Sequence, residues 1–226
     1  MSISENIRSV KKRIELAARR RGRDPSDITL VVVSKNRPVS AIREVIDQGI
    51  TDIGENRAQE ILPKYEAIGD QVKWHFIGHL QRNKVKYIVP FVYLIQSVDS
   101  IELAAEINKR ANKVSKVQDV LLEVNVSGEA TKHGFSAEKV IPAIEELRQM
   151  ENIRVKGLMT MAPFTDNVEL IRPYFARLRV LFNDLSGREG PNVKMRYLSM
   201  GMTNDFEVAI EEGSNMVRIG TAIFKP

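Results

Sequence analysis

Short apolar runs alternate with segments of helical periodicity along almost the whole chain. The apolar runs have the length of buried strands, and the segments between them place apolar residues at the spacing of amphipathic helices. Strands are predicted at residues 28–34, 50–53, 72–77, 91–96, 119–126, 153–159, 193–198 and 215–219. Helices are predicted at residues 38–48, 56–68, 80–89, 99–112, 136–150, 166–186 and 203–212. This alternation is typical of βαβ units and a parallel sheet.

Residues that begin or end helices lie at several of these boundaries. Pro38 is expected as the first residue of its helix. Gly49 and Gly69 are expected to end the first two helices that follow strands. Asp99 and Ser136 are predicted to cap two later helices, because their side chains can accept from free backbone N–H groups.

The number and order of these units predict an α/β fold, a (β/α)8 TIM barrel. A doubly wound open sheet is the alternative, but it would normally carry a glycine fingerprint after its first strand, and SKNRPVS (34–40) has none. Only TAIFKP follows Gly220, which leaves no room for an eighth helix after the last strand. An extra helix at residues 3–21 can cover that position if the barrel closes. We therefore predict a single domain over residues 1–226.

The predicted N-terminal helix carries many basic residues and one apolar stripe. Ser2 and Glu5 have the spacing of a capping box at its start. The formal net charge of the chain is +5, but no aromatic residues are interleaved with these charges to stack on bases. A solvated helix face is therefore favoured over a nucleic-acid-binding surface. The stripe consists of Ile7, Val10, Ile14 and Ala17.

The composition is that of an ordinary globular protein, with 43% hydrophobic and 28% charged residues. No apolar run reaches the length of a transmembrane helix, and MSISENIRSVKKR lacks the apolar core of a secretory signal. The chain contains no cysteine, which agrees with a reducing compartment and excludes thiolate metal sites. We expect a cytoplasmic protein that binds neither a membrane nor nucleic acid.

The loops after the last two predicted strands have the composition of a phosphate site. In barrels of this class the functional site lies at the carboxyl ends of the strands, and phosphate commonly binds after strands seven and eight. The segments YLSMGMTND (197–205) and VRIGT (217–221) offer hydroxyl groups and closely approachable backbone, with no acidic residue before Asp205. The candidate phosphate ligands are Ser199, Gly201, Thr203, Gly220 and Thr221.

Lys35 ends the apolar run LVVVSK (30–35), beside the eighth strand of a closed barrel. Arg218 interrupts the apolar segment MVRIG (216–220), and side-chain alternation would turn both cations toward one cavity. A lysine desolvated there, beside a second cation, is expected to have a lowered pKa and to act as a nucleophile. An amine beside a phosphate site indicates either pyridoxal phosphate (PLP) or a phosphorylated sugar handled by a Schiff-base aldolase.

Arg218 favours the first of these ligands. A guanidinium only donates hydrogen bonds, so it would keep a pyridine nitrogen unprotonated and weaken the ring as an electron sink. A sugar-phosphate aldolase would need acid–base residues around its lysine, and the sequence places no such pair clearly there.

Six segments of the chain resemble the pyridoxal phosphate homeostasis proteins, single-domain relatives of the barrel half of alanine racemase. The matching segments are VVVSKNRP, GENRAQE, WHFIGHLQRNK, GLMTMAP, LSMGMTND and VRIGTAIF. The resemblance implies a PLP-binding barrel that buffers or delivers intracellular PLP, with apo PLP-dependent enzymes as recipients and no clearly established turnover. It implies Lys35 as the Schiff-base lysine and Arg218 as the pyridine-nitrogen partner. The other residues that it implies are Ser199, Gly220 and Thr221 at the phosphate, Asn56 as a polar pocket residue, and Ile77 and Met200 near the ring.

The resemblance also bears on catalysis. Alanine racemases use two bases, one a lysine and the other a tyrosine from a second domain of the partner subunit. This chain stops where that domain would start, so we expect no efficient racemisation. A weak PLP-dependent racemase remains the alternative, and a monomer is expected.

The three histidines are expected to be scattered. His75 lies in a predicted strand and is read as a core residue, His79 lies near the rim, and His133 lies in a polar loop. Without converging ligands or an HExxH motif, we predict no metal site.

Overall fold

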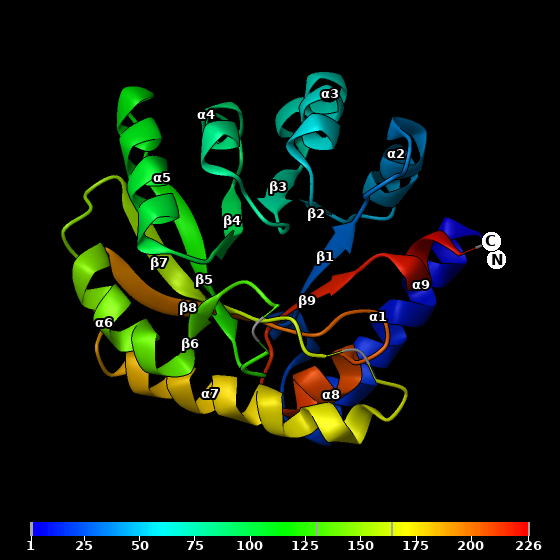
Figure 1. Cartoon of the computed structure of the whole chain (residues 1–226). Coiled ribbons are helices and arrows are strands. Elements are labelled where there is room, and N and C mark those ends of the chain that lie inside the picture. The colour runs from blue at the N-terminus through cyan, green and yellow to red at the C-terminus, as the bar shows by residue number, and fades with distance from the viewer. Residues whose placement is uncertain (1, 130, 164, 226) are drawn as a thin grey trace.

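The computed structural model describes residues 2–225 with the exception of residues 130 and 164, and its central feature is a closed parallel barrel (Figure 1). The strands run in the order β4-β3-β2-β1-β9-β8-β7-β5, and β4 pairs with β5 to close the ring. Two-residue β6 pairs only with β5. The (β/α)8 prediction is confirmed. The strands are β1 (Thr29–Val33), β2 (Asp52–Glu55), β3 (Lys73–Phe76), β4 (Leu94–Val98), β5 (Gln118–Asn125), β6 (Phe135–Ser136), β7 (Ile153–Met159), β8 (Val193–Ser199) and β9 (Met216–Ile219).

Helices surround the barrel, and none that the structure describes combines the length and apolarity needed to cross a membrane (Figure 1). Two helices begin later than predicted, because 3-10 turns at Arg82–Lys84 and Val168–Ile171 precede them. The helices are α1 (Ile3–Arg20), α2 (Val39–Asp47), α3 (Ala58–Ile68), α4 (Val85–Ile88), α5 (Ile101–Lys113), α6 (Ala137–Leu147), α7 (Arg172–Ser186), α8 (Phe206–Glu211) and α9 (Thr221–Phe224).

Two predicted helix boundaries are wrong by one residue. Pro38 has an extended backbone and precedes α2, which begins at Val39. The cap of α5 is Ser100 rather than Asp99, because the Ser100 hydroxyl accepts from the backbone N–H of Leu103 at 3.3 Å. The Ser2–Glu5 capping box, Gly49 and Gly69 are confirmed. Ser136 precedes α6 as predicted, but its side chain makes no capping hydrogen bond.

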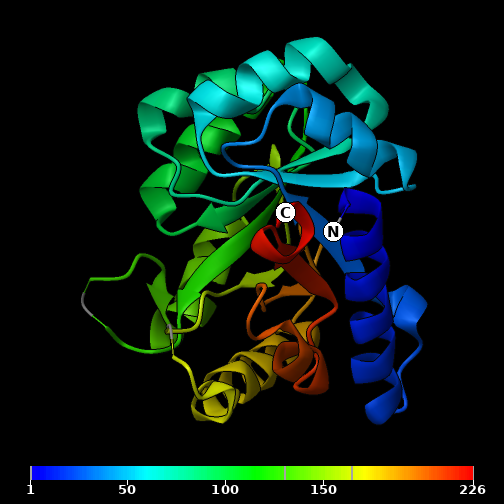
Figure 2. The ribbon, with the colours of Figure 1, turned by 90° about the vertical axis from the view of Figure 1, so that its right-hand side faces the viewer.

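Helix α1 covers the side of the barrel after β9, where the described part of the chain forms the four-residue α9. Figure 2 shows α1 running beside α8 and α9, and it also packs against α2. The Asn6 side-chain amide donates to the carbonyl oxygens of Ile223 at 3.0 Å and Lys225 at 2.9 Å. The predicted stripe of α1 is buried, so the helix takes the place of the missing eighth helix.

Apolar residues form two separate clusters. The larger cluster fills the space between the strands and the helices. The smaller one lies inside the barrel and includes Val31 of β1 and Met216 of β9. Because alternate residues face opposite sides, Val32 and Val217 join the outer cluster instead. The inner cluster does not include the residues at the carboxyl ends of the strands, where a binding site can form. Its buried members are Val31, Leu94, Leu121, Met159 and Met216.

Candidate functional site

A cavity of about 490 Å³ opens at the carboxyl ends of the barrel strands. Its lining comes from the segments that follow β1, β2, β3, β7, β8 and β9. This is the end of the barrel at which the sequence predicted a site. Thr203 of the candidate phosphate ligands lines it, as do six of the eight residues that the resemblance implied: Lys35, Asn56, Ile77, Arg218, Gly220 and Thr221.

Lys35 lies in the turn after β1, and its side chain is exposed at the edge of the cavity. The predicted desolvation of this lysine is wrong, because β1 ends at Val33 and the turn carries the chain outward. Lys35 nevertheless lines the same cavity as the loops after β8 and β9, and its role toward a ligand there stays a prediction.

A buried ion pair fixes the backbone on either side of that lysine. Lys64 of α3 binds the Glu55 carboxylate at 2.6 Å and the carbonyl oxygen of Ser34 at 2.8 Å. Burial raises the pKa of Glu55, while the hydrogen bonds from Lys64 and Ser34 oppose that rise. On the other side, the backbone N–H of Asn36 donates to Glu60 at 2.7 Å. The lysine thus has a fixed main chain and an accessible side chain.

Arg218 is a buried cation in the floor of the cavity. The residue is only 3% exposed, and its guanidinium donates from Nη1 to the Ser199 hydroxyl at 2.6 Å and from Nη2 to the Thr160 carbonyl oxygen at 2.8 Å. Burial lowers its pKa to about 10, and the carboxylates of Asp205 and Glu123 act in the opposite direction. The guanidinium therefore stays protonated at neutral pH and offers donors only.

Ser199 and Met200 lie beneath the cavity rather than on its lining. Both are fully buried. The Ser199 hydroxyl accepts from Arg218 and donates to Gln96 Oε1 at 2.7 Å, so both of its hydrogen-bonding roles are occupied. Its direct role at a phosphate stays a prediction, and the structure places it as the residue that orients Arg218.

The loops after β8 and β9 meet in one wall of the cavity. Thr203 accepts from the backbone N–H of Ala222 at 3.4 Å, which joins the two loops. A side chain at position 220 would lie 2.9 Å from the Val33 carbonyl oxygen, so Gly220 is required for this close approach. No described residue accepts from the backbone N–H of Gly220 or Thr221. This wall therefore offers backbone and hydroxyl donors to an anion.

Asn56, which follows β2, presents a buried acceptor at another part of the lining. Its Oδ1 has no hydrogen-bond partner among the described residues. A buried polar atom without a partner costs free energy, so this atom marks a place for a donor group of a ligand. Ile77, after β3, adds apolar surface beside it.

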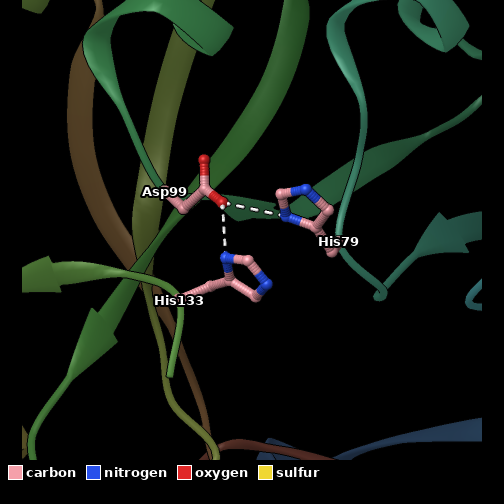
Figure 3. Close-up of side chains that lie close together, drawn as sticks. All are labelled: His79, Asp99 and His133. Carbon is pink, nitrogen blue, oxygen red and sulfur yellow. Dashed lines mark hydrogen bonds and ion pairs between the residues drawn. The ribbon is translucent and has the colours of Figure 1, made fainter. Parts of the chain in front are cut away.

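The histidines are not scattered as predicted. His75 is a core residue, fully buried between Asp52 at 3.0 Å and Gln96 at 3.0 Å. His79 and His133, however, meet at Asp99 outside the cavity lining (Figure 3). Their positions in the sequence could have indicated this group, because His79, Asp99 and His133 follow the adjacent strands β3, β4 and β5.

Comparison with known proteins identifies the family. Residues 3–226 match the alanine racemase N-terminal domain. A protein from Aquifex aeolicus named pyridoxal phosphate homeostasis protein is 49% identical over 225 residues, which cover 99% of this chain and 98% of that protein. The chain belongs to the pyridoxal phosphate homeostasis protein family. The resemblance predicted from the six segments is confirmed.

Solved structures support the same assignment. PipY of Synechococcus elongatus, solved with PLP bound, is 30% identical with a TM-score of 0.84, over 99% of this chain and all of that one. An alanine racemase from Clostridium difficile shares the fold, with 18% identity and a TM-score of 0.72, over 97% of this chain but 56% of that one. The second comparison concerns the fold alone.

Proposed function

We propose that this protein binds PLP in the cavity at the barrel mouth and takes part in intracellular PLP homeostasis as a cofactor carrier. The observation that carries the proposal is one cavity that combines an accessible lysine amine, a buried guanidinium and a donor-rich wall. The proposal includes a cytoplasmic monomer that passes the cofactor to enzymes that need it. An exposed lysine supports such a role, because a covalently held ligand there can be reached and released.

The lining residues fit the groups of PLP. Lys35 supplies the amine that condenses with the aldehyde to a Schiff base, with loss of water. Gly220 and Thr221 donate to the phosphate. Arg218 faces the pyridine nitrogen as a donor, which leaves that nitrogen unprotonated. The unpartnered oxygen of Asn56 accepts from a polar group of the ring. When bound, the cofactor supplies an electrophilic aldehyde, and these residues hold it.

Three other predicted residues act around this set. Ile77 contacts the ring from the lining. Ser199 acts through Arg218, because its hydroxyl accepts a hydrogen bond from the guanidinium. Met200 is fully buried beside Ser199, and its place near the ring rests on the family resemblance.

The ionisable groups of the lining favour a carrier over a racemase. Racemisation needs a base on each face of the cofactor. Among the lining residues that the structure describes, no tyrosine or histidine is present. Asp205, the lining carboxylate, is buried and already accepts from the backbone N–H of Met202. The described lining thus offers two exposed amines, Lys35 and Lys225, and no tyrosine to act as the second base of a racemase.

An absorbance spectrum of the protein with PLP tests the cofactor and the lysine together. We expect a band at about 420 nm, as a protonated lysine Schiff base of PLP gives. The band should be absent in Lys35→Ala and present in Lys225→Ala, since Lys225 lines the same cavity and is a matched control. If the wild type shows only free PLP, the cofactor assignment fails and borohydride trapping with sugar phosphates becomes the next experiment.

A racemisation assay separates the carrier from the enzyme. Loss of optical rotation of alanine or serine is followed with PLP-loaded protein. Turnover at ordinary enzyme rates, on the order of 1 s⁻¹ or faster, would replace the carrier proposal with the racemase alternative.

A further inference from the structure

A second group of side chains at the barrel mouth has the donor set of a transition-metal site. His79, Asp99 and His133 lie in the segments that follow β3, β4 and β5 (Figure 3). None of them lines the cavity that contains Lys35. The group is thus separate from the proposed PLP site, and an inference about it does not depend on that proposal.

The three ligand atoms already lie close to metal-binding geometry. His79 Nδ1 is 3.1 Å and His133 Nδ1 is 3.8 Å from the same Asp99 oxygen, Oδ2. All three ligand atoms lie within 4.8 Å of one another. Bonds of about 2.1 Å in a tetrahedral site separate ligand atoms by about 3.4 Å. Shifts of less than about 1 Å would therefore suffice to place an ion between them.

The side chains of the group converge on one carboxylate oxygen. The two imidazole rings stack, with centroids 4.0 Å apart, and both turn Nδ1 toward one carboxylate oxygen (Figure 3). The other Asp99 oxygen, Oδ1, accepts from the Ser100 hydroxyl at 3.1 Å. A hydrogen bond of this kind orients a metal-ligating carboxylate. Asp99 is thus fixed with one oxygen left for the histidines.

Exposure leaves room for an ion to enter. The side chains of His79 and His133 are 47% and 57% exposed, while that of Asp99 is 11% exposed. The carboxylate lies at the base and the imidazoles lie at the open side. Water can therefore complete the coordination of an ion held by three protein ligands.

We propose that His79, Asp99 and His133 bind a divalent transition-metal ion of the zinc class. Two imidazoles and one carboxylate suit Zn²⁺, Co²⁺ or Ni²⁺, whereas Mg²⁺ and Ca²⁺ prefer oxygen ligands alone. The ion would join the segments that follow three neighbouring strands. It would thus stabilise the side of the barrel mouth opposite the loops after β8 and β9.

Histidine-ring NMR with Zn²⁺ tests the site, using untagged protein free of PLP. The chain has three histidines, and buried His75 serves as an internal reference. One equivalent of Zn²⁺ should shift the ring resonances of His79 and His133 and leave those of His75 unchanged. Substitution of each ligand, by His79→Gln or His133→Gln, should weaken Zn²⁺ binding at least about tenfold in competition with a chromophoric chelator.

A neighbouring variant controls for general loop effects. Lys132→Ala removes the side chain next to His133 and should leave Zn²⁺ affinity unchanged. Because both histidines are well exposed, their glutamine variants should fold, which far-UV circular dichroism checks. The proposal is overturned if Zn²⁺ moves neither ring, moves only one of them, or binds both glutamine variants as tightly as the wild type.

Discussion

Glu123 is a carboxylic acid in a position where its charge is costly. It lies on β5 and is only 4% exposed. Burial raises its pKa from 4.5 to about 7, with a further rise from the Asp99 carboxylate, while Arg218 and His133 lower it. Glu123 therefore changes charge near neutral pH, between the buried guanidinium of the cavity and the histidine group of the rim.

This titration predicts a pH dependence of stability. The pKa of Glu123 in the folded protein is above its ordinary value, so its favourable contribution is complete below about pH 4.5. It is lost as the pH rises to about 7, because the unfolded chain releases the proton first. The loss amounts to about 3 kcal/mol, and Glu123→Gln should not show it. Urea unfolding of both proteins at pH 4.5 and pH 8 measures the difference.

Other buried acids are present in both proteins. Burial also raises the pKa values of Glu55 and Asp205, and their contributions cancel when the variant is compared with the wild type at each pH. A chelator is included so that no metal ion binds beside Glu123. A difference in unfolding free energy that is the same at both pH values would contradict the assignment.

The sequence predicted some single residues of the site and not others, for physical reasons. Lys35 and Arg218 were predictable because each places a charge in an apolar strand pattern. The hydrogen bond that turns Ser199 toward Arg218 depends on side-chain directions across two strands, which no local pattern encodes. His79 and His133 meet because they follow β3 and β5, the two strands that flank β4, and local sequence reasoning treated them as separate.

The turn between β8 and α8 shows how one element constrains the site. Gly201 has a φ of +96°, and a Cβ there would lie 2.6 Å from Ala209 Cβ and 2.8 Å from Phe206 Cα. Its carbonyl oxygen also accepts from the backbone N–H of Arg218 at 3.0 Å. Close packing of α8 therefore requires glycine at position 201. The sequence suggested a different reason, the close approach of an anion to the backbone.

Gly201→Ala should lower the free energy of unfolding by about 2–4 kcal/mol, from backbone strain and overpacking together. It should also weaken PLP binding, because this turn carries Thr203, which lines the cavity, and its carbonyl oxygen holds the Arg218 backbone. Urea denaturation and PLP titration measure the two effects. The matched control is Gly187→Ala, where φ is −77° and the nearest contact is an ordinary 3.4 Å. Equal stability of the two variants would contradict the account of the turn.

The elements themselves were largely predictable, because each strand is a short apolar run between helical segments. All eight predicted strands are present. The differences lie at helix starts and at β6, which pairs only over Val124–Phe135 and Asn125–Ser136. So short a pairing depends on how β5 and the following segment meet in space, and it leaves no periodic pattern in the sequence.

At the scale of the molecule, element order was enough to predict the barrel and the covering role of α1. Eight parallel strands close the sheet, and α1, which precedes the first strand in the chain, covers the position of the eighth helix. The size of the cavity was not predictable in this way, since it depends on which inward side chains fill the barrel. Val31 and Met216 of the inner cluster are examples of such inward side chains.

The barrel and α1 should unfold as one unit, and the single tryptophan allows a direct test. Trp74 is buried on β3, whereas α1 packs against α2, α8 and α9. Fluorescence of Trp74 and far-UV circular dichroism should give the same urea midpoint, independent of protein concentration for a monomer. Asn6→Leu removes both hydrogen bonds to the C-terminal segment and should lower both midpoints equally.

The expected loss for Asn6→Leu is about 1–3 kcal/mol, because two carbonyl oxygens lose a buried donor. Ser9→Ala, at an exposed position of the same helix, is the control and should change stability little. If Asn6→Leu lowers the circular dichroism midpoint but not that of Trp74, then α1 is a separate covering element. Equal shifts mean that the helix placed before the first strand is part of what holds the closed barrel together.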